Sequence, residues 1–500
     1  MTTHLKTLIF LLGLIGGIAV GEKSPYATEI IIFSVVTLLV EGVVYFWSKR
    51  KGMSSYVALT LITLSLGVII GAVRMQFVAE SARFICESVC KVEVAVERKG
   101  DAKDTYQTFD VQVDEETLLV RVRAPLYPEY KVGDRLELSG KITVPENFVP
   151  HGEKKSFDYV SYLEINRVGS ESYYPKITIL DPAPHTLKQR LQVFHGQLVA
   201  RIMEYVSEPA SYLASGMLLG VSSFSSELLE TFRVTGLSHI VVLSGFNITI
   251  LIVFVLILLR PLPVSVRVVV ASLVVVIFVT MVGGGSSLVR ASGMAFISLL
   301  ALLFGRGYVA SQALLISLIA ILLYSPLSLF YDASLHLSFL ATAGIVYGCQ
   351  SLEEIFSKWL SRGASQLLAA TIAAYLSTLP YILYTFGTFS LYGVMSNLLV
   401  LPLVPLTMSF TALTLLMSFL HPVPAILLGV IAGGLGDVII FFAGTIEGLP
   451  MSSSLVSISA TMMVALYIVV IIFFVFLRTR EKNETTETKD GDLVSPIMRF

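Results

Sequence analysis

Polar side chains gather within one apolar segment of the chain, residues 235–247. An ionisable group in the hydrocarbon of a membrane costs about 2.5 kcal/mol or more, so such groups usually face a bundle interior or a water-filled cavity. Hydroxyl, imidazole and amide groups could line a hydrated passage here, or a serine could act as a nucleophile with a histidine as its base. The alternative without function is that the hydroxyls return hydrogen bonds to their own helix. The candidate residues are Ser238, His239, Ser244, Gly245 and Asn247.

Two further clusters place charged groups in apolar surroundings. Residues 283–293 combine a triple glycine with Arg290, which predicts a broken helix or re-entrant turn where backbone amides and the guanidinium meet an anion. The alternative is that Arg290 pairs structurally with Asp332. Residues 331–342 place Asp332 and His336 near one helical face by their spacing. Asp332 could instead cap the helix that follows it.

A fourth polar position lies where an apolar segment contains two prolines. Residues 397–406 begin with Asn397 and include Pro402 and Pro405. Proline lacks a backbone donor and clashes with the preceding turn, so the helix must kink or break here. Such a break is tolerated in a membrane where neighbours or water satisfy the freed carbonyls. We therefore expect Asn397 to line a path.

Apolar segments must position these side chains. A hydrocarbon core of about 30 Å needs roughly 17 to 25 apolar residues in a helix. The chain contains about twelve such segments, at residues 5–21, 27–47, 56–73, 236–259, 268–283, 288–304, 312–330, 333–349, 367–386, 394–420, 425–447 and 455–477.

Composition agrees with a membrane protein and excludes an ordinary soluble enzyme. Of the 500 residues, 55% are hydrophobic and 14% charged, whereas the charged share of soluble domains is about 25%. The net charge of -1 shows no overall excess of basic residues that would attract a polyanion such as a nucleic acid. The three cysteines, Cys86, Cys90 and Cys349, form no zinc signature, and we expect no metal or cofactor. A Cys86–Cys90 disulfide would require a turn in that stretch.

Residues 74–185 predict a β domain inserted between membrane segments. Alternating stretches at 89–96, 117–123 and 135–144 are typical of short strands, and about five strands with glycine turns suit an OB-like β-barrel. Residues 74–190 hold 17 basic and 19 acidic side chains, so a spacer or assembly role is an alternative to nucleic-acid contact. The expected fold class is an α-helical polytopic membrane protein, about 12 transmembrane segments, with this extracytoplasmic domain.

The basic loops set the expected orientation. If every segment crosses once, they all fall on one side, which the positive-inside rule makes cytoplasmic together with both termini. The first segment could instead be a cleaved signal peptide, with the downstream orientation unchanged. The expected divisions are N-terminal spans at 1–73, the β domain at 74–185, an amphipathic membrane-surface region at 186–235, a channel domain at 236–477 and a disordered cytoplasmic tail at 478–500.

Several of these blocks resemble the ComEC family of competence proteins. The run 235–250 resembles the family signature, in which a Gly-Leu-Ser-His start leads to a Ser-Gly-Leu-His core. Residues 331–345 resemble its Asp-x-x-Phe-Gln-Leu-Ser-Phe-x-Ala-Thr block, and residues 390–406 its Asn-Leu-Leu-x-x-Pro-Leu-Val block. Residues 133–163 are similar to its N-terminal OB-type domain.

The resemblance implies a channel in the inner (plasma) membrane that passes one strand of external DNA into the cytoplasm during natural transformation. The chain departs from the pattern where Asn247 and Phe246 replace the core His and Leu, and where His336 replaces Gln. It lacks the His-x-His-x-Asp-His run of the metallo-β-lactamase-like domain that many members carry, so we expect no enzyme here and a separate nuclease. The expected channel lining is Ser238, His239, Ser244, Gly245, Asn247, Arg290, Asp332, His336 and Asn397.

The partners that follow are single-stranded DNA, the lipid bilayer and an extracytoplasmic DNA receptor. No Gly-x4-Gly-Lys-Ser/Thr phosphate loop occurs, so a cytoplasmic helicase or ATPase must supply the driving force. Two alternatives stay open: an intramembrane serine hydrolase using Ser244 with His239 or His336, and a transporter of a small polar or lipid solute. The candidate DNA-binding residues of the β domain are Arg121, Arg123, Lys131, Arg135 and Lys141.

Overall fold

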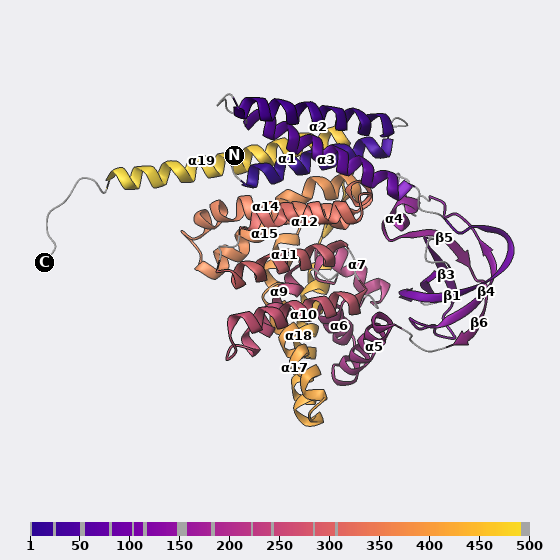
Figure 1. Cartoon of the computed structure of the whole chain (residues 1–500). Coiled ribbons are helices and arrows are strands. Elements are labelled where there is room, and N and C mark those ends of the chain that lie inside the picture. Colours follow the sequence, from indigo (N-terminus) through magenta and orange to yellow (C-terminus); the bar gives the residue numbers. More distant parts are fainter. Residues whose placement is uncertain are drawn as a thin grey trace. The chain divides into compact units, whose positions relative to one another are not determined.

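The chain folds into two compact units in a computed structural model. Figure 1 labels the helices and strands. The first unit comprises residues 1–200 and 244–335, and the second comprises residues 201–243 and 336–500. The structure describes residues 3–23, 27–50, 56–79, 83–102, 105–113, 118–147, 158–181, 186–221, 224–241, 245–283, 286–305 and 309–491.

Most of the described residues are helical, as the apolar segments predict. The helices of the first unit are α1 (Thr3–Lys23), α2 (Ala27–Arg50), α3 (Tyr56–Ala79), α4 (Tyr159–Ile165), most of α5 (Leu187–Tyr205), α9 (Gly245–Leu258), α10 (Val264–Val282), α11 (Ser286–Leu303), α12 (Ala310–Tyr324) and α13 (Ser328–Tyr331). Those of the second are α6 (Ala210–Leu219), α7 (Ser226–Val234), α8 (Ser238–Val241), most of α14 (Ala333–Phe356), α15 (Arg362–Thr385), α16 (Gly393–Val400), α17 (Leu403–Ser418), α18 (Pro422–Glu447) and α19 (Ala460–Gly491).

Seven described helices are long and apolar enough to cross a membrane: α1, α3, α10, α14, α15, α18 and α19. The pair α16 and α17 adds an eighth span if it is counted as one, and it bends by 41° at the predicted break. These helices support a polytopic membrane protein, but the predicted twelve spans are not confirmed. Four apolar helices, such as the 15-residue α12, are shorter, and 15 residues at about 1.5 Å each reach only ~22 Å.

Glycines allow α1 and α3 to pack with their backbones in close approach. A Cβ at Gly13 or Gly17 of α1, or at Gly67 or Gly71 of α3, would lie closer than 3.0 Å to backbone atoms of the opposite helix. The spacing in each helix is small-xxx-small, the pattern that lets helices associate in lipid through dispersion contacts. The four glycines therefore form one seam between the two helices, which the sequence interpretation did not identify.

Polar contacts attach this helix pair to α12 and α13 in the first unit. Arg74 of α3 donates hydrogen bonds to the carbonyl oxygens of Leu323 (2.6 Å) and Tyr324 (2.9 Å). These are carbonyls of the last turn of α12, where a cation is favourable. The hydroxyl of Tyr331 donates to Glu22 of α1 at 2.6 Å. The Tyr331 contact holds the residue immediately before Asp332 in place.

The inserted domain is a six-stranded sheet in the order β5-β3-β2-β1-β4-β6. All neighbours are antiparallel except β3 and β5. One face carries the core, in which Phe109, Val111, Val120 and Val122 are at most 1% exposed. The strands are β1 (Cys86–Ala102), β2 (Tyr106–Gln112), β3 (Leu119–Pro125), β4 (Arg135–Ile142), β5 (Val168–Tyr173) and β6 (Lys176–Asp181).

The strands confirm the predicted β domain, but the prediction of a closed β-barrel is wrong. Among the described residues, β5 forms no ladder with β4; it reaches that side of the sheet through an isolated bridge between Thr143 and Glu171 and a hydrogen bond from the hydroxyl of Ser172 to the carbonyl of Lys141 at 2.8 Å. The physical reason is that β6 already occupies the free edge of β4 along Arg135 to Ser139. The backbone donors and acceptors of that edge are satisfied, so β5 cannot form a ladder with it.

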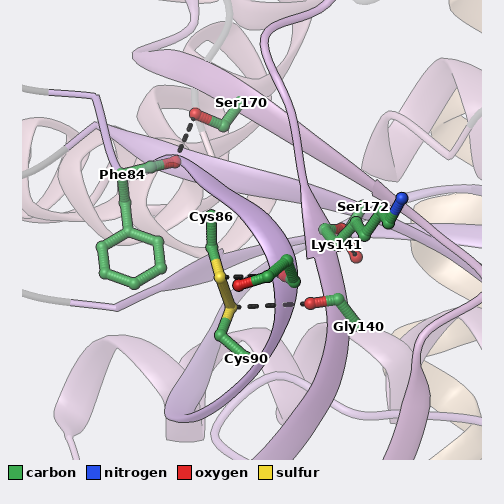
Figure 2. The surroundings of a disulfide bond; sticks show 8 residues. Phe84, Cys86, Cys90, Gly140, Lys141, Ser170 and Ser172 are labelled. Atoms are coloured by element: carbon green, nitrogen blue, oxygen red, sulfur yellow. Dashed lines mark hydrogen bonds between the residues drawn. A yellow bond between two sulfur atoms is a disulfide. The ribbon is translucent and has the colours of Figure 1, made fainter.

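Cys86 and Cys90 form a disulfide at the start of β1 (Figure 2). Four residues of regular strand would separate their Cα atoms by about 13 Å, whereas the observed Cα separation is 6.4 Å. The pairing of β1 with β4 shifts register between the two cysteines, so an irregularity within the strand brings them together, and not the turn that the sequence interpretation required. Near the bond, the hydroxyl of Ser170 donates to the carbonyl of Phe84 at 2.7 Å.

In the second unit, small residues bring α6 and α18 together. A Cβ at Gly436 of α18 would lie 2.7 Å from the Cβ of Ala210 on α6. Two short strands, β7 (Thr388–Ser390) and β8 (Ser453–Leu455), pair antiparallel. Helix α19 continues beyond its apolar part to Gly491, into the stretch predicted to be disordered. Residues 492–500 of that stretch lie outside the described part of the chain.

Candidate functional site

Arg290 and Asp332 are buried within the first unit, 3% and 8% exposed. Arg290 lies near the start of α11, and Asp332 lies between α13 and α14. Burial disfavours the charge of the Arg290 guanidinium, and the negative charge of Asp332 offsets this only in part. Oδ1 of Asp332 accepts a hydrogen bond from the amide of Leu335 at 3.1 Å. Asp332 therefore caps α14, as one structural interpretation of the sequence predicts. Its charge acts on Arg290, but the two side chains form no direct ion pair in the described structure, so the predicted pairing stays a prediction. Oδ2 of Asp332 is buried and has no hydrogen-bond partner among the described residues.

Gly245 and Asn247 lie on α9, which packs against α11. A Cβ at Gly245 would lie 3.6 Å from the Cβ of Ala291, the residue after Arg290. Asn247 lies two residues after Gly245 on α9 and is 5% exposed. The structure thus places four predicted lining residues on neighbouring elements of one unit. We call them the Arg290 cluster: Gly245, Asn247, Arg290 and Asp332.

The second unit brings together two other predicted segments. Gly236 has a φ of +74°, a conformation that favours glycine. A Cβ at this position would lie 3.2 Å from the Cα of Gly393. Asn397 lies one turn beyond Gly393 on α16, is 9% exposed, and its Oδ1 is buried without a hydrogen-bond partner in the described part of the chain. Ser238 and His239 of α8 follow Gly236 and are exposed.

His336 has a defined partner in the second unit. Its Nδ1 lies 2.8 Å from the hydroxyl of Tyr381, and the two rings meet edge to face with centroids 5.1 Å apart. Tyr381 follows Pro380, which interrupts the hydrogen bonding of α15. Ser244 lies outside the described residues, so the predicted serine and histidine pair cannot be measured.

The five basic candidates of the sheet domain differ in their contacts and exposure. Arg121 donates to both oxygens of Asp110, at 2.8 and 3.1 Å, and Asp110 is 1% exposed. Burial opposes the charge of Arg121, but the hydrogen bond and the charge of Asp110 outweigh it and raise the pKa of Arg121 above its ordinary value. Lys131, Arg135 and Lys141 are exposed.

Arg123 lies between two aromatic rings. Its guanidinium carbon is 4.5 Å from the ring centroid of Tyr106 and 5.0 Å from that of Tyr173. Glu171, 4% exposed, accepts hydrogen bonds at 2.7 Å from the hydroxyls of Tyr159 and Tyr173. Burial and this hydrogen bond raise the pKa of Tyr173 to about 12. The sequence interpretation missed Tyr173 and Glu171, because only the parallel pairing of β3 with β5 places them beside the arginines.

Comparisons with known proteins agree with the blocks found in the sequence. The family model described as Competence protein matches residues 217–481. The chain is 22% identical over 275 residues to ComE operon protein 3 of Bacillus subtilis (strain 168), covering 54% of this chain. The match spans 34% of that relative's length. No solved structure matches the chain.

Proposed function

Because the chain belongs to the Competence protein family, we propose that it acts in DNA uptake. In this proposal it is a multi-pass inner-membrane protein, with cytoplasmic termini, that passes single-stranded DNA into the cytoplasm. The observation that carries the proposal is the Arg290 cluster. A guanidinium that is 3% exposed among apolar helices has a high energetic cost in a membrane, and such groups mark the paths of ions and other charged substrates.

The cluster has the chemistry that a phosphate needs when it leaves water. Arg290 offers planar N–H donors that match phosphate oxygens, and the amide of Asn247 offers further donors. Asp332 is fixed by its bond to the amide of Leu335, and its carboxylate keeps the guanidinium from binding an anion too tightly to release it.

We propose that the chain is not itself an enzyme. The ring of His336 is engaged by Tyr381, which supports a structural role for that imidazole rather than a role as a general base. A cytoplasmic helicase or ATPase would then supply the driving force, a separate nuclease would degrade the strand that is not transported, and an extracytoplasmic receptor would deliver the DNA. The sheet domain would lie outside the cytoplasm and face that receptor. We further propose that it binds DNA in the manner of an OB-like domain.

The test is DNA uptake by cells whose only copy of the gene carries Arg290→Ala. The matched control is Arg260→Ala, which removes the same charge from an exposed position just beyond the end of α9. At equal protein level in the membrane, we expect Arg290→Ala to abolish uptake of labelled DNA and Arg260→Ala to retain it. Normal uptake by Arg290→Ala would remove this residue from the path. Normal transformation after deletion of the gene would refute the role in uptake.

A further inference from the structure

Arg123 faces away from the core of the sheet domain. Its neighbours Val122 and Ala124 are fully buried, and side chains alternate along a strand, so Arg123 projects from the opposite face. The register places Tyr173 of β5 directly beside Arg123, and Tyr106 lies on β2 along the other side of β3. Three strands therefore build one group on the outer face, the Tyr106–Arg123–Tyr173 group.

The donors of Arg123 are not used within the described structure. Arg121, two residues earlier on the same face, directs its N–H groups to Asp110. Arg123 contacts Tyr106 and Tyr173 through ring faces, and no described residue accepts a hydrogen bond from it or pairs with its charge. A guanidinium that stacks in this way leaves its in-plane donors available for a phosphate or carboxylate.

Tyr173 offers a fixed aromatic surface beside that cation. Its hydroxyl donates to the buried Glu171 at 2.7 Å, which restrains the ring at its far end. The residue is nevertheless 52% exposed. Tyr174 follows, 55% exposed, and its amide donates to the backbone carbonyl of Arg123 at 2.8 Å. The site therefore combines an open ring with free donors a few ångströms away.

We propose that the Tyr106–Arg123–Tyr173 group binds an unpaired nucleotide of single-stranded DNA. The base stacks on Tyr173, and the adjoining phosphate accepts hydrogen bonds from Arg123. This inference rests on the proposed function, in which a DNA strand reaches the chain from outside. Residues 74–190 contain 17 basic and 19 acidic residues, so the domain is not basic as a whole. Charge attraction to DNA is therefore weak on its own, and stacking of a base is needed for binding.

The same geometry singles out Arg123 from the other basic candidates. The N–H groups of Arg121 are occupied by a carboxylate, whereas Lys131, Arg135 and Lys141 are exposed and have no ring contact with a described residue. Arg135 is therefore a matched control. It carries the same charge on β4 of the same sheet, but lacks the aromatic partners that the proposed site requires.

The experiment measures binding of two probes to the full chain in lipid nanodiscs. One probe is a fluorescent 20-nucleotide oligothymidine, and the other is an abasic oligonucleotide with the same number of phosphates. We expect oligothymidine to bind more tightly than the abasic strand. Tyr173→Ala should weaken oligothymidine binding by about 5- to 140-fold, the range that stacking of one base supplies, and leave its salt dependence unchanged.

The arginine variants report on the phosphate contact. Arg123→Ala should weaken both probes and reduce the slope of log affinity against log salt by about 0.7, the value for one phosphate contact with a single strand. Arg135→Ala should weaken both probes less than Arg123→Ala does, because Arg135 lacks the aromatic partners. Tyr173→Phe, which keeps the ring and loses the bond to Glu171, should bind oligothymidine almost as wild type, and this separates stacking from misfolding of Tyr173→Ala.

Three results would overturn the inference. They are equal binding of the abasic strand and oligothymidine, wild-type binding by Tyr173→Ala, and equal losses in Arg123→Ala and Arg135→Ala. Each is distinguishable from failure of the proposed function. Cells that take up DNA normally with Tyr173→Ala and Arg123→Ala in place refute this site alone, whereas normal transformation without the gene refutes the role in uptake itself.

Discussion

Removing Arg290 alone should destabilise the first unit more than removing Arg290 and Asp332 together. The two groups are 3% and 8% exposed, and the negative charge of Asp332 offsets part of the cost of burying the Arg290 guanidinium. In Arg290→Leu, the Asp332 carboxylate stays buried without its cation, and its Oδ2 has no hydrogen-bond partner in the described structure. Removing one partner of a buried ion pair in contact costs about 3–5 kcal/mol. Arg290 and Asp332 form no direct ion pair in the described structure, so we expect a smaller loss.

The double variant Arg290→Leu/Asp332→Asn leaves neither charge buried. Asparagine caps a helix about as well as aspartate, so the hydrogen bond to the amide of Leu335 is retained. Replacing both members of a buried pair by neutral side chains is often close to neutral in stability. We therefore expect the double variant to recover most of the free energy of unfolding that the single variant loses.

Thermal unfolding of the purified protein in detergent checks the stability, and uptake of labelled DNA checks the function. The melting temperature should fall in Arg290→Leu and return close to wild type in the double variant. Uptake should stay abolished in both, because neither carries the guanidinium. A double variant as unstable as the single one would refute the pairing of the two charges. A double variant with wild-type stability and wild-type uptake would show that the pair is only structural.

Two further predictions concern the glycine seam and Tyr173. Gly17→Leu should lower the melting temperature, since overpacking costs about 1–3 kcal/mol. Gly16→Leu should leave the melting temperature unchanged, because no atom lies within 4 Å of a Cβ at that position. Thermal unfolding compares the two variants, and an equal loss of melting temperature in both would contradict the seam. The folded-state pKa of Tyr173 is raised from 10.0 to about 12, so its contribution to stability is complete below pH 10 and is lost as the pH rises toward 12. Unfolding curves should therefore show a smaller loss over this range in Tyr173→Phe than in wild type, and identical losses would count against the raised pKa.

Elements with a strong local pattern could be predicted from the sequence. Period-two alternation predicted β1, β3 and β4, and long apolar runs predicted the spans. Proline chemistry predicted the bend between α16 and α17 at Pro402. The cap at Asp332 was also predictable, because a carboxylate just before an apolar helical run has few other local partners.

Features that depend on pairing between distant segments could not be predicted. The apolar run at 312–330 predicts one span, whereas α12 ends at Tyr324, because Pro326 disfavours helix in the residue before it. The open sheet depends on β6 choosing the edge of β4, which composition does not reveal. Tyr173 reaches Arg123 only because β3 and β5 run parallel.

Because of the seam between α1 and α3, each of these two helices provides the surface on which the other packs. Lipid tails are as apolar as leucine, so no hydrophobic force drives these helices together, and their association depends on the shallow grooves at Gly13, Gly17, Gly67 and Gly71. Deleting α1 would leave the groove of α3 lined by hydrocarbon chains that cannot match its shape. Arg74 would then hold the end of α12 from an unsupported helix, so damage at the N-terminus would spread to the residues that position Asp332.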